Sequence, residues 1–230
     1  MRKYDGQILE IGLLPDGQLT AWIECPPEAV PAAGRYLMAW ACNDLEAPLA
    51  TPLFAGSLST SGFLAAPPIP QAWTPGEPLF LYGPSGRGFQ IPAAARRLAV
   101  AALGNTALRL LPLLPPALEQ GAAIALFCDA PITGLPSEVE IHPLSSFKEA
   151  LDWTDHLALD LPLETLDELP SLLGREHPSQ ELSFSGQALV GAAMPCGGLA
   201  DCGACALETR RGWRLACKDG PVFDLKDLIR

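Results

Sequence analysis

Four of the seven cysteines in this 230-residue chain lie close together near its C-terminus, with the spacing C-x5-C-x2-C-x11-C. They are Cys196, Cys202, Cys205 and Cys217. Glycines stand between the first three, at positions 197, 198 and 203. Thiolates select zinc, copper(I) or an iron–sulfur cluster, and glycines let the backbone curve around such a group and direct amides at it. The segment therefore predicts a small unit folded around sulfur ligands.

The spacing discriminates between the metals. A structural zinc site usually takes two close cysteine pairs separated by a longer insert. Here three cysteines share one loop and the fourth stands alone, as in the plant-type ferredoxin spacing C-x4-C-x2-C…C that holds a [2Fe–2S] cluster. We therefore predict a [2Fe–2S] cluster, with zinc or no metal as alternatives. The first gap is one residue longer, and we expect that residue to bulge outward. His142, His156 and His177 lie outside the segment, which argues against Rieske ligation.

The other cysteines, Cys25, Cys42 and Cys128, sit inside apolar, strand-like runs, where cysteine is usually a small buried hydrophobe. The start of the chain lacks the apolar segment of a secretory signal. No run of about 20 apolar residues is present, so no membrane span is expected. These observations predict a cytoplasmic protein with reduced thiols.

The net charge of −11 argues against a nucleic-acid partner. After residue 180, however, basic and acidic residues are equal in number. This stretch carries a local basic group, Arg210, Arg211, Arg214 and Lys218. The group is either a solvated loop or a docking surface for an acidic partner.

Residues 1–96 have the pattern of an antiparallel β-barrel. Two partly alternating runs are joined by Pro15-Asp16-Gly17, which is hairpin turn chemistry. A third strand is expected over 34–43, followed by a proline-rich connection and the strand-like "LFLYGPSGRGF". Short strands with glycine and proline between them are typical of small barrels.

Residues 97–185 alternate between strands and helices, which predicts a parallel sheet covered on both faces. Strands are expected over 98–103, 122–130, 139–144 and 156–162, and helices over 106–121, 145–153 and 163–174. Pro112, Pro115 and Pro116 should kink or break the first helix. Residues 186–230, which begin with a strand-like segment over 187–193, form the predicted cluster-binding domain.

The tail "CGACALETRRGWRLACKDGPVF" resembles the C-terminal iron–sulfur domain of the electron transfer subunit of dihydroorotate dehydrogenase B. The resemblance is strong over roughly the last 35 residues, and the domain order extends it to the whole chain. It implies an FAD-binding ferredoxin-reductase-like barrel, a nucleotide-binding-like α/β domain and a [2Fe–2S] domain. In that family, electrons pass from NADH through FAD and the cluster to the flavin of a catalytic partner subunit.

The expected flavin site and the expected nucleotide site both depart from the family pattern. Ala50 and Thr51 stand where an arginine is expected to hold the flavin pyrophosphate, so a bidentate donor is missing. The flavin-side motif "GPSGRGF" does match, and through it the resemblance implies FAD contacts from Gly83, Pro84, Gly86, Gly88 and Phe89. Alternatively, the motif "GPSGRGF" is only a glycine turn between a strand and the next domain.

On the nucleotide side, the family's glycine-rich turn is reduced to Gly104, and its Cys-Gly-Pro turn is replaced by "LDLP". Both changes argue against NAD(H) binding. We therefore expect an electron-transfer protein that works with a redox partner, such as a dihydroorotate dehydrogenase-like catalytic subunit, and has no catalytic residues of its own. The alternatives are a complete NADH:acceptor flavin reductase with drifted motifs and a zinc-stabilised binding or assembly module.

Overall fold

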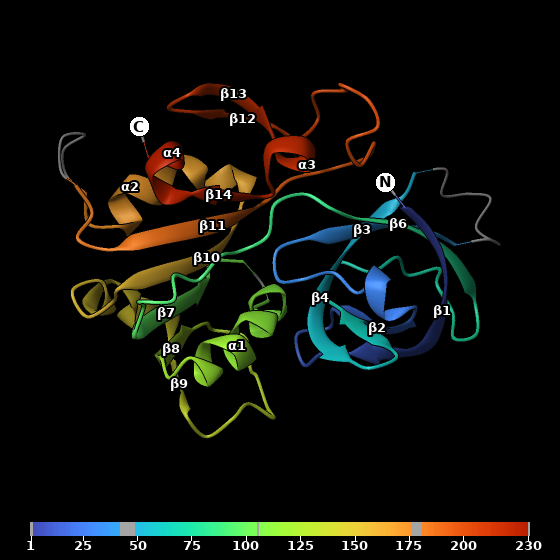
Figure 1. The fold of residues 1–230 in the computed structure, drawn as a ribbon, viewed down its shortest axis with the longest axis horizontal. Helices are drawn as coiled ribbons and strands as arrows, with labels where there is room; N and C mark the ends of the chain where they lie inside the picture. The colour runs from blue at the N-terminus through green and yellow to red at the C-terminus, as the bar shows by residue number, and fades with distance from the viewer. Residues whose placement is uncertain (1, 42–48, 105, 176–180, 230) are drawn as a thin grey trace.

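The computed structural model describes residues 2–41, 49–104, 106–175 and 181–229, so Cys42 and His177 lie outside the described residues. A closed β-barrel and a six-stranded sheet lie side by side, and a two-stranded hairpin stands above the sheet (Figure 1). The predicted combination of a barrel, a parallel α/β sheet and a C-terminal cysteine segment is confirmed.

The barrel has strand order β1-β2-β5-β4-β3-β6. Its strands are β1 (Arg2–Leu13), β2 (Leu19–Glu24), β3 (Tyr36–Ala41), β4 (Thr51–Ser59), β5 (Gly62–Ala65) and β6 (Pro78–Ser85). The predicted hairpin joins β1 to β2, with the Gly17 amide donating to the Leu14 carbonyl at 2.9 Å. A 3₁₀ turn, η1 (Pro27–Ala29), follows β2. Ile8, Ile23, Phe63 and Leu81 are fully buried and fill the barrel.

The sheet has the order β14-β11-β10-β7-β8-β9. Its strands are β7 (Arg97–Ala102), β8 (Ala123–Phe127), β9 (Val139–His142), β10 (His156–Pro162), β11 (Ser185–Gly191) and β14 (Val222–Asp224). All neighbours pair in parallel except β14, which pairs antiparallel to β11. The predicted domain boundary at residue 186 therefore falls within β11, and the C-terminal "CKDGPVF" segment supplies an edge strand to this sheet.

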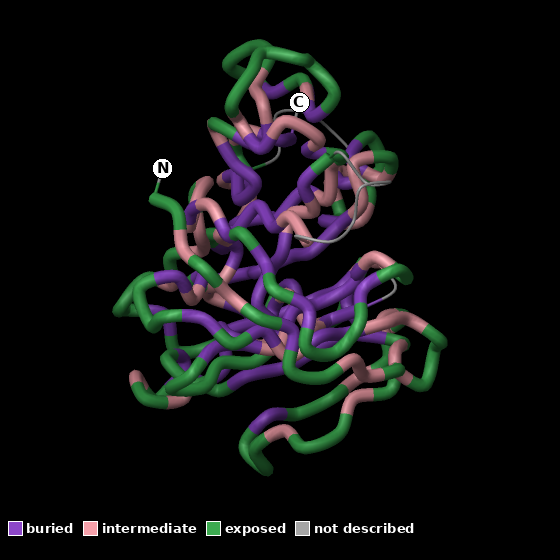
Figure 2. The backbone as a smooth tube through the Cα atoms, turned by 90° about the vertical axis from the view of Figure 1, so that its right-hand side faces the viewer, coloured by how far each residue is buried: buried purple, intermediate pink, exposed green. Residues whose placement is uncertain are grey.

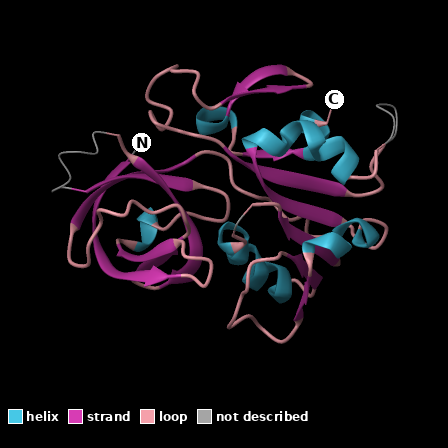
Figure 3. Cartoon of the chain, turned by 180° about the vertical axis from the view of Figure 1, so that it is seen from behind, coloured by secondary structure: helices cyan, strands magenta, loops and turns pink. Residues whose placement is uncertain are grey.

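Helical segments cover both faces of the sheet, as Figure 3 shows from behind. They are η2 (Leu108–Leu113), α1 (Leu114–Glu119), η3 (Leu144–Ala150), η4 (Leu163–Glu168), α2 (Leu169–Leu172) and α4 (Leu225–Leu228). Leu98 and Val100 of β7 pack in the core with η2 and α1, whereas Ala99 and Ala101 pack on the opposite side with η3 and η4. This alternation follows the two-residue period of a strand.

The predicted helices are present but short and largely 3₁₀. Pro112 lies inside η2, and prolines 115 and 116 occupy the first turn of α1, so the 106–121 segment changes from 3₁₀ to α at Leu114. A proline lacks the amide that an α-helix interior requires but is tolerated in a first turn. The same change occurs between η4 and α2, where Pro170 lies in the first turn of α2.

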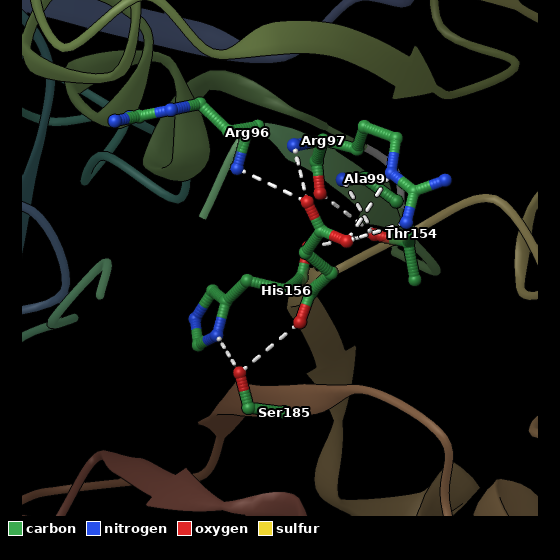
Figure 4. Close-up of polar contacts among 7 residues, drawn as sticks. Arg96, Arg97, Ala99, Thr154, His156 and Ser185 are labelled. Atoms are coloured by element: carbon green, nitrogen blue, oxygen red, sulfur yellow. Dashed lines mark hydrogen bonds and ion pairs between the residues drawn. The ribbon is translucent and has the colours of Figure 1, made fainter. Parts of the chain in front are cut away.

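The N-terminal end of β10 is tied to its two neighbours by the polar segment Thr154–His156 (Figure 4). Asp155 accepts hydrogen bonds from the amides of Arg96 and Arg97 and from the Arg97 guanidinium. His156 Nδ1 lies 2.8 Å from Ser185 Oγ, at the start of β11. These bonds fix where the central strands begin, and therefore where their carboxyl ends meet the barrel.

Candidate metal centre

The cysteine segment connects β11 to the hairpin formed by β12 (Ala206–Thr209) and β13 (Gly212–Leu215) and to the short helix α3 (Ala216–Asp219). Cys205 directly precedes β12 and Cys217 lies in α3. Because Ala206 pairs with Leu215, the hairpin returns the chain to its start, and the Ala216 amide donates to the Cys205 carbonyl at 3.0 Å. In Figure 2, the residues at this end of the molecule are mostly exposed, and those beneath them are mostly buried.

The four sulfur atoms are grouped two and two. Cys196 Sγ lies 3.4 Å from Cys202 Sγ, and Cys205 Sγ lies 3.2 Å from Cys217 Sγ. Two thiolates bound tetrahedrally to one metal at about 2.3 Å lie about 3.8 Å apart, so each pair has close to the spacing of two ligands on one metal. Among the described residues, no three candidate side chains are placed to hold a single metal ion.

The two pairs differ in exposure. Cys205 and Cys217 are buried, Cys196 is half-buried and Cys202 is exposed. Burial, with a contribution from Cys205, raises the pKa of Cys217 to about 12. The backbone of Ala200 and, to a lesser degree, hydrogen bonds from Gly198 and Cys202 lower the pKa of Cys196 to about 7, against the effect of its own burial. A metal binds thiolates and displaces these protons.

The loop that carries Cys196 depends on glycine and on the barrel. Gly197 has a φ of +53°, and a Cβ at that position would lie 2.4 Å from Met38 Cγ of β3. The buried Tyr36 hydroxyl donates to the Cys217 carbonyl at 2.8 Å and lies 3.4 Å from the Gly197 carbonyl. Strand β3 therefore supports both halves of the cysteine segment, a contact that the sequence pattern did not indicate.

The motif "GPSGRGF" packs against the same segment. The Arg87 amide donates to the Gly220 carbonyl, and Arg87 and Pro221 form an isolated parallel bridge. A Cβ at Gly86 would lie 2.7 Å from both the Gly220 carbonyl oxygen and Pro221. The structure thus places this motif at a joint between the barrel and the cysteine segment. The predicted flavin contacts of Gly83, Pro84, Gly86, Gly88 and Phe89 stay a prediction.

A separate cavity of about 690 Å³ lies between the barrel and the carboxyl ends of β7, β10 and β11. Its walls are mostly small and apolar, and they include Ala50, Pro52 and Phe54 on the barrel side. Arg109 of η2 also lines it and forms an ion pair with Asp160 of β10. Sequence reasoning missed this pair, although one aspartate within the apolar strand "HLALDLP" was a signal of a buried polar partner.

The predicted basic group lies around the hairpin and α3. Arg211, Arg214 and Lys218 line a polar hollow of about 450 Å³, together with Arg87 and the carboxylates Asp219 and Asp227. Arg211 is paired with Asp227 at 2.9 Å, and Lys218 is paired with Asp201. Trp213, between Arg211 and Arg214 in sequence, is 69% exposed.

The barrel, the adjoining parallel sheet and the cysteine segment define a ferredoxin-reductase-like fold. Residues 192–229 match the family model described as the iron-sulfur cluster binding domain of dihydroorotate dehydrogenase B. This C-terminal segment is thus similar to that iron–sulfur domain, as its motif predicted. A comparison with curated proteins finds no match. Within the described residues, no helix has the length and apolar character needed to cross a membrane.

Solved structures share the fold at low identity. The NADH-dependent reduced ferredoxin-NADP oxidoreductase, studied for flavin-based electron bifurcation, superposes with a TM-score of 0.72 at 15% identity, over 96% of this chain and 88% of that one. The ferredoxin reductase in carbazole 1,9a-dioxygenase gives 0.58 at 17% identity, over 75% and 65%. Ferredoxin-NADP+ reductase from Plasmodium falciparum gives 0.56 at 10% identity, over 76% and 90%.

Proposed function

We propose that this chain holds a [2Fe–2S] cluster on Cys196, Cys202, Cys205 and Cys217 and exchanges single electrons with a partner oxidoreductase. The observation that carries the proposal is the grouping of the sulfurs into two pairs, at 3.4 and 3.2 Å. A [2Fe–2S] cluster takes four thiolates, two on each iron, whereas one zinc ion would need all four together. When bound, the cluster supplies a one-electron donor and acceptor.

The surrounding residues divide the site into an inner and an outer side. Cys205 and Cys217 are buried, and Tyr36 of the barrel holds the Cys217 backbone. Cys202 is exposed, so the outer side is the shorter route for an electron to a docked protein. Backbone groups near the thiolates, such as those of Gly198 and Ala200 beside Cys196, would help set the reduction potential.

For the partner, the family resemblance supports a dihydroorotate dehydrogenase-like catalytic subunit. The basic side chains beside the cysteine segment support an acidic contact surface on that subunit. A partner that co-purifies with the chain at a fixed ratio would test this part of the proposal.

The cavity between barrel and sheet does not fit the pyrophosphate of FAD or NAD(H). Ala50, Pro52 and Phe54 face it from the barrel, and Arg109 is the one cation among its described lining residues. Arg109 has one guanidinium edge bonded to Asp160, so a single edge remains for the two phosphate groups of a dinucleotide. A diphosphate in a protein site is normally held by cations or by a glycine-rich run of amides. The residues present therefore do not fit a bound dinucleotide, and flavin analysis tests this conclusion.

Anaerobic purification followed by metal, sulfide and flavin analysis tests the proposal. We expect a brown protein with about two irons and two sulfides per chain. Dithionite should bleach the visible spectrum and NADH should leave it unchanged. A colourless protein with one zinc would overturn the proposal in favour of a binding module. Extractable FAD together with bleaching by NADH would instead identify a complete NADH:acceptor reductase.

A further inference from the structure

The ion pair between Arg109 and Asp160 lies at the edge of the cavity and has no role in the cysteine site. Asp160 is fully buried on β10, and the Arg109 side chain is 14% exposed. Burial raises the pKa of Asp160 above its ordinary value, while the charge and hydrogen bonds of Arg109 oppose that shift. Burying a charged pair is costly, so its position at the carboxyl end of the sheet requires an explanation.

The hydrogen bonds of Arg109 leave one edge of its guanidinium open. Nε donates to Asp160 Oδ2 and Nη2 donates to Asp160 Oδ1, both at 2.7 Å. This bidentate contact occupies the Nε/Nη2 edge. The other two-nitrogen edge, formed by Nη1 and Nη2, has the same fork geometry and matches a second planar carboxylate. The Phe54 ring, 5.6 Å from Cζ of Arg109, further fixes the plane of the guanidinium.

A glycine keeps this open edge accessible. A Cβ at Gly191, at the end of β11, would lie 3.5 Å from both Nη1 and Nη2 of Arg109. A side chain at position 191 would therefore contact both nitrogens of the free edge. Gly191, Arg109 and Phe54 all line the same cavity, so the free edge opens into it.

We propose that this cavity binds a small organic carboxylate with a planar, apolar body. Its carboxylate would accept two hydrogen bonds from the Nη1/Nη2 edge of Arg109, which Asp160 holds in place. Its body would lie against the apolar wall that includes Phe54 and Met194. No acidic side chain is among the described lining residues, and the buried charge of Asp160 is compensated by Arg109. Ligand binding in this cavity does not require the cluster.

Isothermal titration calorimetry on the full, anaerobically purified chain tests it, with benzoate as the probe. Wild-type protein should bind one benzoate saturably, and benzamide, which lacks the charge, should bind at least about tenfold more weakly. Gly191→Ala should weaken benzoate binding by about tenfold or more, because its methyl group blocks the guanidinium edge. Arg109→Lys, which keeps the charge but loses the fork, should lose binding to a similar degree.

Gly104→Ala is the matched control. It adds the same methyl group to the same cavity, but its Cβ would meet only Pro162, at 3.9 Å. Benzoate affinity should change less than about twofold there. The absence of saturable benzoate binding to the wild type would overturn the proposal, as would equal losses in the two alanine variants. Phenyl phosphate binding more tightly than benzoate, or FAD retained in the cavity, would also overturn it.

Discussion

At the scale of single residues, the described cysteines are of two kinds. Cys25 and Cys128 are buried in strands or at their ends, and burial raises both of their pKa values, that of Cys25 to about 11. They are small core residues, as predicted. The other four are gathered by one loop and one hairpin, although up to 21 positions separate them in sequence.

Single substitutions should distinguish the four clustered cysteines from Cys25 and Cys128 by their effect on iron and sulfide content. Cys202→Ser and Cys205→Ser each remove one thiolate from a pair, so we expect iron and sulfide to fall to a small fraction of the wild-type content. Cys25→Ala and Cys128→Ala should keep both at the wild-type level, at a cost in stability of about 1 kcal/mol. Iron and sulfide assays with visible spectroscopy measure the outcome. A full visible spectrum in both serine variants would refute the ligand assignment.

His156 predicts a pH dependence of folding. It is buried, its Nδ1 faces Ser185 (Figure 4), and its Nε2 has no hydrogen-bond partner among the described residues. Burial lowers its pKa, and Asp224 only partly offsets this. The unfolded chain therefore takes up a proton first, and stability present above about pH 6.5 is lost as the pH falls toward the folded-state pKa.

Over that window the free energy of unfolding should fall by up to about 1.4 kcal/mol per pH unit more in the wild type than in His156→Asn. Urea unfolding at a series of pH values between about 7 and 5 measures the difference. Subtracting the variant removes the contribution of the other titrating groups. Parallel pH profiles for the two proteins would show that His156 is not responsible.

At the scale of elements, the joint between strand β3 and the cysteine segment is the most consequential contact. Tyr36→Phe removes the hydroxyl that bonds the Cys217 carbonyl and leaves that buried acceptor unpaired, at a cost of about 1–3 kcal/mol. We expect the variant to fold but to lose iron to a chelator several times faster than the wild type. Tyr82→Phe on β6, whose ring packs on Trp40, is the control and should match the wild type.

The elements also show how far the sequence could be interpreted. Apolar runs and turn residues predicted the β1–β2 hairpin and the parallel strands, because those signals are local. Strands β4 and β5 were not singled out, since their glycines, serines and alanines give a weak pattern. The contact of Tyr36 with Cys217 spans 181 positions and that of Arg109 with Asp160 spans 51. Only the folded topology could reveal such partners.

At the scale of the whole molecule, net charge and local charge predict opposite behaviour toward an anion. The chain carries −11 overall, but basic side chains line a hollow beside the cysteine segment. Arg214 lies three residues before Cys217, and Lys218 directly follows it. At about 0.1 M ionic strength the Debye length is about 10 Å. The charges closest to the site should therefore dominate its encounters with a small oxidant.

Charge reversal at two positions tests this. Arg214→Glu and Lys148→Glu change the net charge equally, but Lys148 lies on η3, which packs against β7 and β8. Stopped-flow oxidation of the dithionite-reduced protein by ferricyanide should slow at least about twofold in Arg214→Glu and hardly change in Lys148→Glu. With the cationic oxidant hexaammineruthenium(III), Arg214→Glu should instead react faster than the wild type. Equal effects of both substitutions would mean that net charge governs the approach and that the basic group has no guiding role.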